Sequence, residues 1–182
     1  ENRDKLKKDM NKLLFLIRPE LEEASRRKYG DLFAEIWTYY ESKLLEKFPY
    51  IGGEHVSGTR NLTGAYCFVA MGEVLQKYGV DPEETGHLMV MSYERMTMKM
   101  PWIVRKSIGK LCGNTRLLNK IFRKKDAKNA ANAAKNPGSF ETKTQIPPEE
   151  GSDFSYHNLV CPLADFAKQY GYEAYMPYLC NL

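Results

Sequence analysis

The chain has 182 residues, of which 43% are hydrophobic and 27% are charged, and its formal net charge is +4. This composition is typical of a globular protein with a hydrophobic core and excludes an intrinsically disordered chain. No run of about 18 apolar residues and no signal-peptide pattern is found, so we expect no transmembrane segment. Four cysteines without a paired spacing indicate reduced thiols, and these features together favour a cytoplasmic protein.

The first fifty residues predict a helical N-terminal arm. Apolar residues at spacings of three and four predict an amphipathic helix over residues 2–18. Pro19 interrupts this helix or starts the next one, which runs to Gly30. Asp31 is the predicted N-cap of a third helix, and its apolar face holds Leu32, Ile36, Tyr39, Tyr40 and Leu44.

Residues 51–135 predict a helical core. After a glycine-rich loop, a helix over residues 60–78 ends at Gly79. The sequence DPEE then places an N-cap at Asp81, a proline at the first helical position and a glutamate for a capping box. That helix runs towards Met100, and further helix is expected over residues 102–135, broken around Gly113.

The polarity pattern of the sequence changes after residue 138, from one typical of helices to one typical of strands. Residues 139–145 and 153–160 alternate in polarity and predict two antiparallel strands joined by a short loop. Helices over residues 162–170 and 172–179 follow. The expected architecture is α+β, one domain over residues 1–182, with a helix-rich N-terminal two-thirds packed on a small antiparallel sheet from the C-terminal segment, residues 139–182.

A basic stretch lies in the middle of the chain. Nine lysines or arginines lie between Arg105 and Lys128 with a single acid, Asp126, and apolar residues are interleaved. Such a stretch fits an anionic membrane or nucleic-acid phosphates, and it equally fits a solvated helix face with apolar lysine stems. No glycine-rich phosphate loop or aromatic RNA-binding signature accompanies it, so we expect no specific nucleic-acid partner.

The four cysteines differ in their surroundings. Cys67 and Cys112 lie on or at the end of apolar helices, and we expect both to be packed in the core. Cys161 directly precedes Pro162, which favours the first helical position, so Cys161 is the expected N-cap of the helix PLADFAKQY. Unsatisfied backbone N–H groups and the helix dipole favour an ionised thiolate there. Cys161 is therefore the candidate nucleophile or metal ligand.

The possible partners of Cys161 leave alternatives open. His157 stands four residues earlier, and four residues of straight strand span about 13 Å, so a direct Cys–His dyad within one strand fails. Asp165, one turn into the helix, either orients a proton for Cys161 or only complements the helix dipole. Cys180 with Cys161 and His157 would make an open three-ligand zinc site. No cofactor is assigned; a divalent metal, a reactive thiol and inert packing all remain open.

A family resemblance enters at these residues. The segment CPLADFAKQYGYEAYMPYLCN resembles the characteristic stretch of the L-2-amino-thiazoline-4-carboxylic acid hydrolase family. The matching positions are Tyr156, Cys161, Pro162, Asp165, Tyr170, Gly171, Cys180 and Asn181. The resemblance covers roughly residues 60–182 and is specific over the last thirty. Family members continue past the second cysteine with further strands, so the resemblance implies that this chain is truncated at its C-terminus.

The resemblance implies a hydrolase of a cyclic C–N–S substrate. The family's reaction opens L-2-amino-thiazoline-4-carboxylate to N-carbamoyl-L-cysteine, which needs a nucleophile or base, an acid for the leaving sulfur and a cation for the carboxylate. The implied catalytic residues are Cys161 as nucleophile or ligand and Asp165 or His157 for proton transfer. The implied substrate-binding residues are Arg60, Arg95, Tyr156 and Asn158.

A second similarity implies a different function class. The cysteine spacing is similar to that of small-molecule-binding domains related to 4-vinyl reductases, which place a helical part against an antiparallel sheet. Those domains often bind ligands without catalysis. The alternative function is therefore a non-enzymatic ligand-binding or sensor domain. In both cases the expected partner is a small molecule, and homo-oligomerisation stays open.

Overall fold

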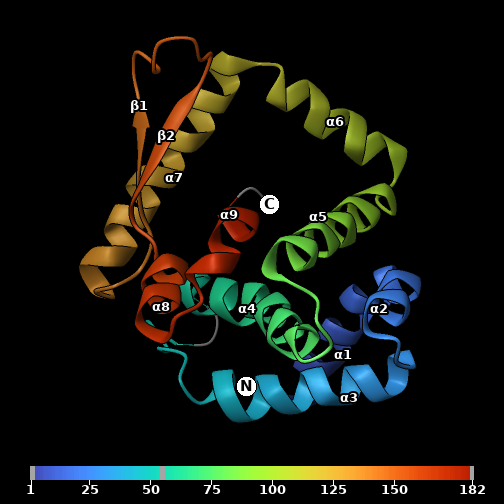
Figure 1. Ribbon diagram of the computed structural model, residues 1–182. Helices are drawn as coiled ribbons and strands as arrows, with labels where there is room; N and C mark the ends of the chain where they lie inside the picture. Colours follow the sequence, from blue (N-terminus) through green and yellow to red (C-terminus); the bar gives the residue numbers. More distant parts are fainter. Residues whose placement is uncertain (1–2, 54–55, 181–182) are drawn as a thin grey trace. The chain divides into compact units, whose positions relative to one another are not determined.

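The computed structural model describes residues 3–53 and 56–180, with the backbone alone at residue 57. The fold is α+β, mostly helical with one small antiparallel sheet near the C-terminus, which confirms the expected class (Figure 1). The chain forms two compact units. The first unit holds residues 1–49, 60–99 and 163–182, and the second unit holds residues 50–59 and 100–162.

The first unit begins with a chain of short helical segments. They are α1 (Arg3–Leu14), the 3₁₀ turn η1 (Phe15–Ile17), α2 (Arg18–Ser25), α3 (Tyr29–Tyr39) and the π-helical turn η2 (Tyr40–Leu45). The predicted break at Pro19 falls at the start of α2, where proline is tolerated because the first helical N–H groups have no intrahelical partner. Buried Leu14, Ile17 and Leu21 carry one apolar face through these turns.

The predicted N-cap at Asp31 is wrong. Helix α3 begins two residues earlier, at Tyr29, and its N-cap residue is Lys28, whose side chain makes no capping hydrogen bond. The backbone N–H of Tyr29 instead donates to Oε1 of Glu22, at 2.8 Å. A carboxylate from α2 thus satisfies a donor at the start of α3, and the sequence around Asp31 could not reveal this tertiary contact.

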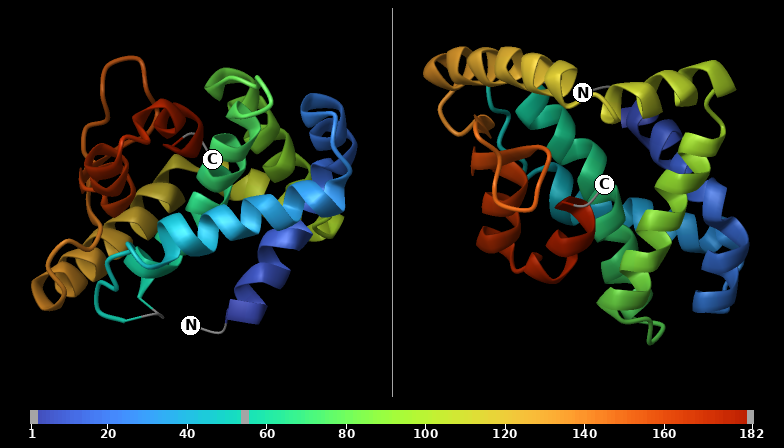
Figure 2. Two further views of the ribbon diagram at one scale, coloured as in Figure 1. Left: turned by 60° about the horizontal axis from the view of Figure 1, so that its bottom comes forward. Right: turned by 90° about the horizontal axis from the view of Figure 1, so that it is seen from above.

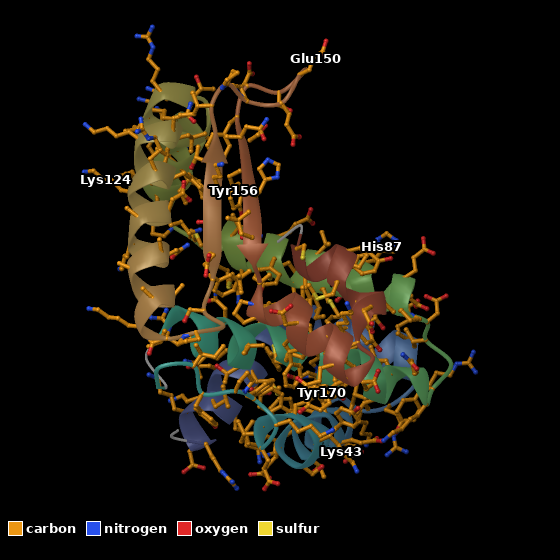
Figure 3. All side chains as sticks on the ribbon, turned by 90° about the vertical axis from the view of Figure 1, so that its left-hand side faces the viewer. Lys43, His87, Lys124, Glu150, Tyr156 and Tyr170 are labelled. Atoms are coloured by element: carbon orange, nitrogen blue, oxygen red, sulfur yellow. The ribbon has the colours of Figure 1, made fainter. Side chains whose placement is uncertain are left out.

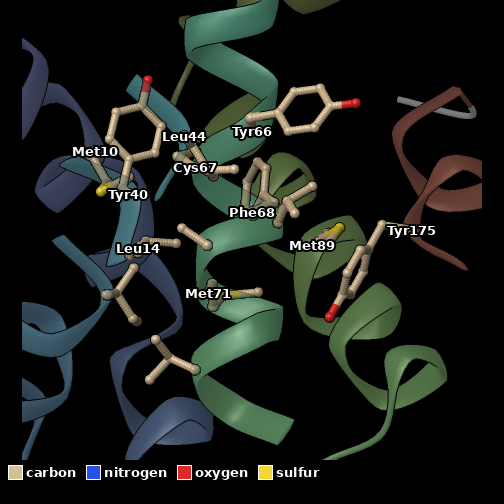
Figure 4. Close-up of a cluster of buried hydrophobic side chains, with 14 of the residues drawn as sticks. Met10, Leu14, Tyr40, Leu44, Tyr66, Cys67, Phe68, Met71, Met89 and Tyr175 are labelled. Carbon is tan, nitrogen blue, oxygen red and sulfur yellow. The ribbon is translucent and has the colours of Figure 1, made fainter. Parts of the chain in front are cut away.

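Helix α4 (Ser57–Gln76) forms the centre of the first unit from residue 60 onward. Figure 4 shows Tyr66, Cys67, Phe68 and Met71 on this helix, between side chains of the N-terminal helices on one side and Met89 and Tyr175 on the other. Residues on several sides of α4 are fully buried, including Leu62, Phe68, Val69 and Leu75. A helix that is apolar on several sides belongs in a core, which explains its central place.

The C-terminal segment packs on α4 and α5 (Pro82–Met98) through two glycines. A Cβ atom added at Gly72 would overlap the ring of Tyr175, and one added at Gly86 would overlap the ring of Tyr178. These tyrosines belong to the 3₁₀ turn η3 (Glu173–Tyr175) and the short helix α9 (Met176–Cys180), which follow α8 (Pro162–Tyr170). The expected helix over residues 172–179 is therefore split into a 3₁₀ turn and a short α-helix.

Two predicted helix signals are confirmed in this unit. Gly79 closes the turn after α4 with a φ of +84°, a conformation that glycine adopts without steric cost. The Asp81 side chain caps α5 by accepting the N–H of Glu84 at 2.8 Å.

The second unit is built from two helices and a hairpin. Helix α6 (Trp102–Cys112) is followed by α7 (Thr115–Lys135), β1 (Glu141–Gln145) and β2 (Ser155–Val160). The predicted break at Gly113 is confirmed, and Asn114 caps α7 by accepting the N–H of Leu117 at 3.0 Å. The right-hand view of Figure 2 shows α6 and α7 as two separate helices.

The hairpin packs on α7 through one carboxylate and one aromatic cluster. Thr142 Oγ1 donates to Oδ1 of Asp126 at 2.7 Å, and both the N–H and the hydroxyl of Thr144 donate to Oδ2, at 2.7 and 2.5 Å. The ring of Phe122 lies 4.9 Å from Phe154 and 5.0 Å from Tyr156, between centroids. Asp126, the single acid of the basic stretch, therefore fixes β1 on α7.

In the part of the chain that the structure describes, none of the helices combines the length and apolar character that crossing a bilayer requires.

Candidate anion-binding site

Helix α7 carries a row of cations beside the face that packs on the hairpin. Phe122 and Asp126 face the strands, so the α7 residues on the other sides of the helix do not pack on the hairpin face. Four of these α7 residues are basic: Arg116, Lys120, Arg123 and Lys124. Figure 3 shows Lys124 directed away from the hairpin. Together the four basic residues line a hollow of about 580 Å³ with Asn119, Ala127 and Ile146.

A second hollow of about 540 Å³ adjoins the first at the edge of β1. It is lined by Arg123, Lys143, Thr144, Gln145, Ile146 and His157. Arg123 and Ile146 line both hollows, so the two form one continuous basic surface around the Arg123 guanidinium. We call this surface the Arg123 site. Its lining holds five lysines or arginines and one histidine, without a carboxylate or a thiol.

The cations of the Arg123 site are not neutralised by neighbours. Within residues 3–53 and 56–180, none of Arg116, Lys120, Arg123, Lys124 and Lys143 forms an ion pair with a carboxylate. Like charges that line the same surface repel one another, and an anion that enters the site relieves the repulsion.

The nearby Asp126 does not supply the missing counter-charge. Burial alone would raise the pKa of Asp126, but hydrogen bonds from the hydroxyls of Thr142 and Thr144 and from the Thr144 N–H hold this pKa below its ordinary value. The carboxylate therefore stays ionised, and both of its oxygens are occupied by β1.

His157 lies at the far end of the Arg123 site. Its Nε2 atom is 2.6 Å from Oε1 of Gln145 and 3.4 Å from Oε1 of Glu149. Opposite it in the hairpin register stands Lys143, on the same face of the sheet. Because an amide oxygen only accepts, Nε2 donates to Gln145, and the ring can also donate to an anion held by Lys143 and Arg123 only as an imidazolium, through a second N–H at Nδ1.

Charge is separated within this unit. Residues 100–162 contain eleven lysines and arginines against five acids, a formal charge of +6, whereas the whole chain carries +4. Three of the five acids, Glu149, Glu150 and Asp153, stand in the loop between the strands, and Figure 3 shows Glu150 at its tip. The cations remain on the helices and β1.

The predicted catalytic residues and metal ligands are divided between the two units. Cys161 belongs to the second unit, follows β2, directly precedes α8 as expected and is half-buried. Asp165 and Cys180 belong to the first unit, and both are exposed. Asn181, a further position of the family resemblance, lies outside the described residues. In the described residues, no group of three or more His, Cys, Asp or Glu side chains is placed to hold a metal.

The predicted residues of β2 lie on two faces of the hairpin. Tyr156 packs on Phe122 of α7, whereas His157 is directed to the opposite face, towards Gln145. Asn158 is exposed. The structure does not bring Tyr156 and His157 together around one small ligand.

The two predicted carboxylate-binding arginines differ in their environment. Arg95 donates both terminal nitrogens to the carboxylate of Glu20 and also donates to the carbonyl of Leu16, at 2.7 Å. Its bidentate fork is already occupied by this internal pair. Arg60 is exposed near the start of α4.

Of the two cysteines that we expected in the core, one is buried and the other is exposed. Cys67 is buried and donates to the carbonyl of Gly64, and burial raises the pKa of its thiol to about 12. Cys112 is exposed, so the expectation that it is packed is wrong. It ends α6, a helix without a buried residue, and apolar neighbours in the sequence do not guarantee a core when the whole helix lies at the surface.

The basic stretch is visible in the sequence, but the Arg123 site is not. Lys143, Gln145 and Ile146 are contributed by β1 and its loop, more than fifteen residues from Arg123. The available signal was the alternation of ETKTQ, which puts Lys143 and Gln145 on the face away from Asp126.

Comparison of the chain with protein-family models, with curated proteins and with solved structures gives no match. The resemblance to the thiazoline-carboxylate hydrolases therefore remains a prediction.

Proposed function

We propose that the second unit is a binding module for ligands that carry a phosphate or another multivalent anionic group, and that the Arg123 site holds this group. The observation that carries the proposal is the convergence of five unpaired cations from α7 and β1 on two adjoining hollows without a carboxylate. The proposal belongs to the ligand-binding class, one of the two function classes that the sequence leaves open.

The chemistry of the lining supports an oxyanion as the ligand. Arg123 offers a planar fork of donors that matches phosphate or carboxylate, while the lysines act as mobile point charges. Thr144, Gln145 and His157 add polar groups on one side, and Ile146 adds an apolar contact shared by both hollows. Hydrogen bonds to charged groups contribute about 1.5–3 kcal/mol each.

Calorimetric titration with inorganic pyrophosphate tests the proposal. We expect saturable binding that weakens with added salt and falls by roughly tenfold or more in Arg123→Gln, because one charge-assisted hydrogen bond is lost. Lys43→Gln is the matched control, since it removes one exposed cation from the first unit. Equal weakening in both variants, or no saturation, would contradict a specific site.

A second candidate function is the hydrolase that the family resemblance implies. The observation that favours it is the position of Cys161, half-buried and directly before the nine-residue helix α8. In this proposal the Cys161 thiolate or an activated water adds to the ring carbon between sulfur and nitrogen. The ring carbon–sulfur bond breaks, and the sulfur takes up a proton and leaves as a thiol. Where Cys161 adds, water then attacks the same carbon and displaces the Cys161 thiol, which gives N-carbamoyl-L-cysteine and restores the free cysteine.

Incubation with L-2-amino-thiazoline-4-carboxylate and detection of the released thiol tests this second candidate. The expected result is that Cys161→Ser abolishes ring opening while Cys112→Ser, at an exposed position, retains it. Absence of product with the unsubstituted protein, while pyrophosphate binds, would leave the binding function alone.

A further inference from the structure

Helix α6 exposes several large apolar side chains to solvent. None of its residues is buried. Trp102 and Ile103 are 63% and 68% exposed, and Val104 and Ile108 are also exposed. On α7, which follows α6 after a short turn, Leu117 and Ile121 are also exposed. Contiguous exposed apolar side chains rimmed by charge mark an interaction surface.

Cations flank these apolar side chains on both helices. In α6, Ile103, Val104 and Ile108 share one side, and Lys106 and Lys110 lie on the neighbouring side. The Lys106 Nζ atom lies 4.7 Å from the centroid of the Trp102 ring. In α7, Leu117 and Ile121 directly follow Arg116 and Lys120, two cations of the Arg123 site. The surface thus combines an apolar strip with a cationic border.

Charge decides between the possible occupants of this surface. A second copy of the chain would bring two segments of formal charge +6 together, and the like charges would oppose association. A nucleic acid would satisfy the cations but leave the isoleucines in water. An anionic lipid bilayer offers both partners, phosphate-bearing headgroups and an apolar interior next to them.

We propose that α6 and the N-terminal half of α7 dock on an anionic lipid bilayer. Ile103, Val104 and Ile108, which share one side of α6, enter the headgroup–acyl boundary, while Trp102, beside Lys106 at the start of the helix, lies at the level of the headgroups. Lys106, Lys110 and the Arg123 site contact lipid phosphates. The headgroup contact rests on the proposed function, since it uses the same anion-binding cations, whereas the apolar contact is independent of it. The mode is that of an amphipathic helix lying in the interface plane.

Vesicle co-sedimentation gives the first test. We expect the protein to bind vesicles of phosphatidylcholine containing roughly one third phosphatidylserine and to leave pure phosphatidylcholine vesicles unbound, because each basic residue near an anionic surface strengthens binding about fivefold. The triple variant Arg116→Gln, Lys120→Gln, Lys124→Gln should lose at least tenfold in binding. Lys8→Gln, Lys43→Gln, Lys168→Gln removes the same charge from the first unit and should lose much less.

A single-residue pair isolates the apolar contact. Ile103→Gln and Leu159→Gln remove equivalent side chains that are 68% and 62% exposed, the first on α6 and the second on β2. Ile103→Gln should weaken binding to the anionic vesicles several-fold, because an aliphatic side chain no longer enters the bilayer, and should leave pyrophosphate binding unchanged. Leu159→Gln should leave both unchanged.

Tryptophan fluorescence reports the contact directly. The chain has two tryptophans, and Trp37 is only 7% exposed, whereas Trp102 is 63% exposed. Anionic vesicles should shift the emission to shorter wavelength, and Trp102→Phe should abolish the shift.

Four outcomes would overturn the inference. Pyrophosphate binding without vesicle binding would leave the proposed function standing and remove the bilayer. Loss of both would remove both proposals. A concentration-dependent dimer that Ile103→Gln converts to monomer would assign the apolar strip to a second copy. Tighter binding to a single-stranded DNA oligonucleotide than to the anionic vesicles, unaffected by Ile103→Gln, would assign the cations to nucleic acid.

Discussion

At the residue scale, the reactivity of the thiols depends on where each sulfur lies. Cys67 is buried with a pKa raised to about 12, and Cys161 is half-buried before a helix. At about pH 7.5, we expect iodoacetamide to modify Cys161 much faster than Cys67, because Cys67 has almost no thiolate and no access. Peptide mass spectrometry over time measures both rates. Modification of Cys161 no faster than Cys67 would contradict a reactive thiol and, with it, the hydrolase candidate.

Two glycines of α4 give a matched pair for core packing. A Cβ at Gly72 would overlap the Tyr175 ring, whereas a Cβ at Gly64 has no atom within 4 Å. Gly72→Ala should therefore reduce the free energy of unfolding by about 1–3 kcal/mol through overpacking. Gly64→Ala should raise it by about 0.5–1 kcal/mol, because alanine is the better helix former. Urea denaturation distinguishes the two, and equal effects would contradict the close contact of Tyr175 with α4.

At the element scale, Asp126 links β1 to α7, and the link should depend on pH. Because hydrogen bonds lower the pKa of Asp126 in the folded chain, its contribution is complete above its ordinary value of 3.8 and is lost as pH falls through the lower folded value. Asp126→Asn should reduce the stability of the second unit by about 1–2 kcal/mol at neutral pH. The difference in the free energy of unfolding between Asp126→Asn and the unsubstituted protein should become smaller when the pH falls below 3.8, the ordinary pKa of aspartate.

Signals from Thr142 and Thr144 in NMR spectra, followed during unfolding, would measure this effect. Asp153→Asn, in the exposed loop between the strands, is the control and should cost little. A destabilisation by Asp126→Asn that stayed constant down to the lowest pH would show that the ionised carboxylate is not the cause.

Helix ends that are set by neighbouring residues, such as caps and glycine breaks, were predictable from the sequence. Contacts between residues far apart in the sequence were not. Asp81 caps α5 and Gly113 separates α6 from α7 as expected, since each acts on its own neighbours. The start of α3 was wrong because Glu22 of another helix satisfies Tyr29. The Arg123 site follows the same rule: the basic run was visible, but its hollows exist only after β1 folds back on α7.

At the scale of the whole molecule, the two units differ in what they bury. The large fully buried side chains, such as Tyr40, Tyr66, Phe68 and Phe166, belong to the first unit. The second unit carries the exposed apolar side chains of α6 and a formal charge of +6 over residues 100–162, which leaves −2 for the rest of the chain. The first unit therefore supplies most of the hydrophobic stabilisation, and the second unit carries the surface that we propose for binding.

This difference predicts the pattern of amide hydrogen exchange. Helix α6 has eleven residues, contains Gly109 and buries no side chain, and helices this short are marginal in water without packing. Its amides should exchange orders of magnitude faster than those of α4 around Phe68, which open only on global unfolding. Anionic vesicles should slow exchange in α6 and leave α4 unchanged, because a bilayer supplies the packing that the protein does not. Equal protection of α6 and α4 in the absence of lipid would show that the protein itself already covers the apolar face of α6.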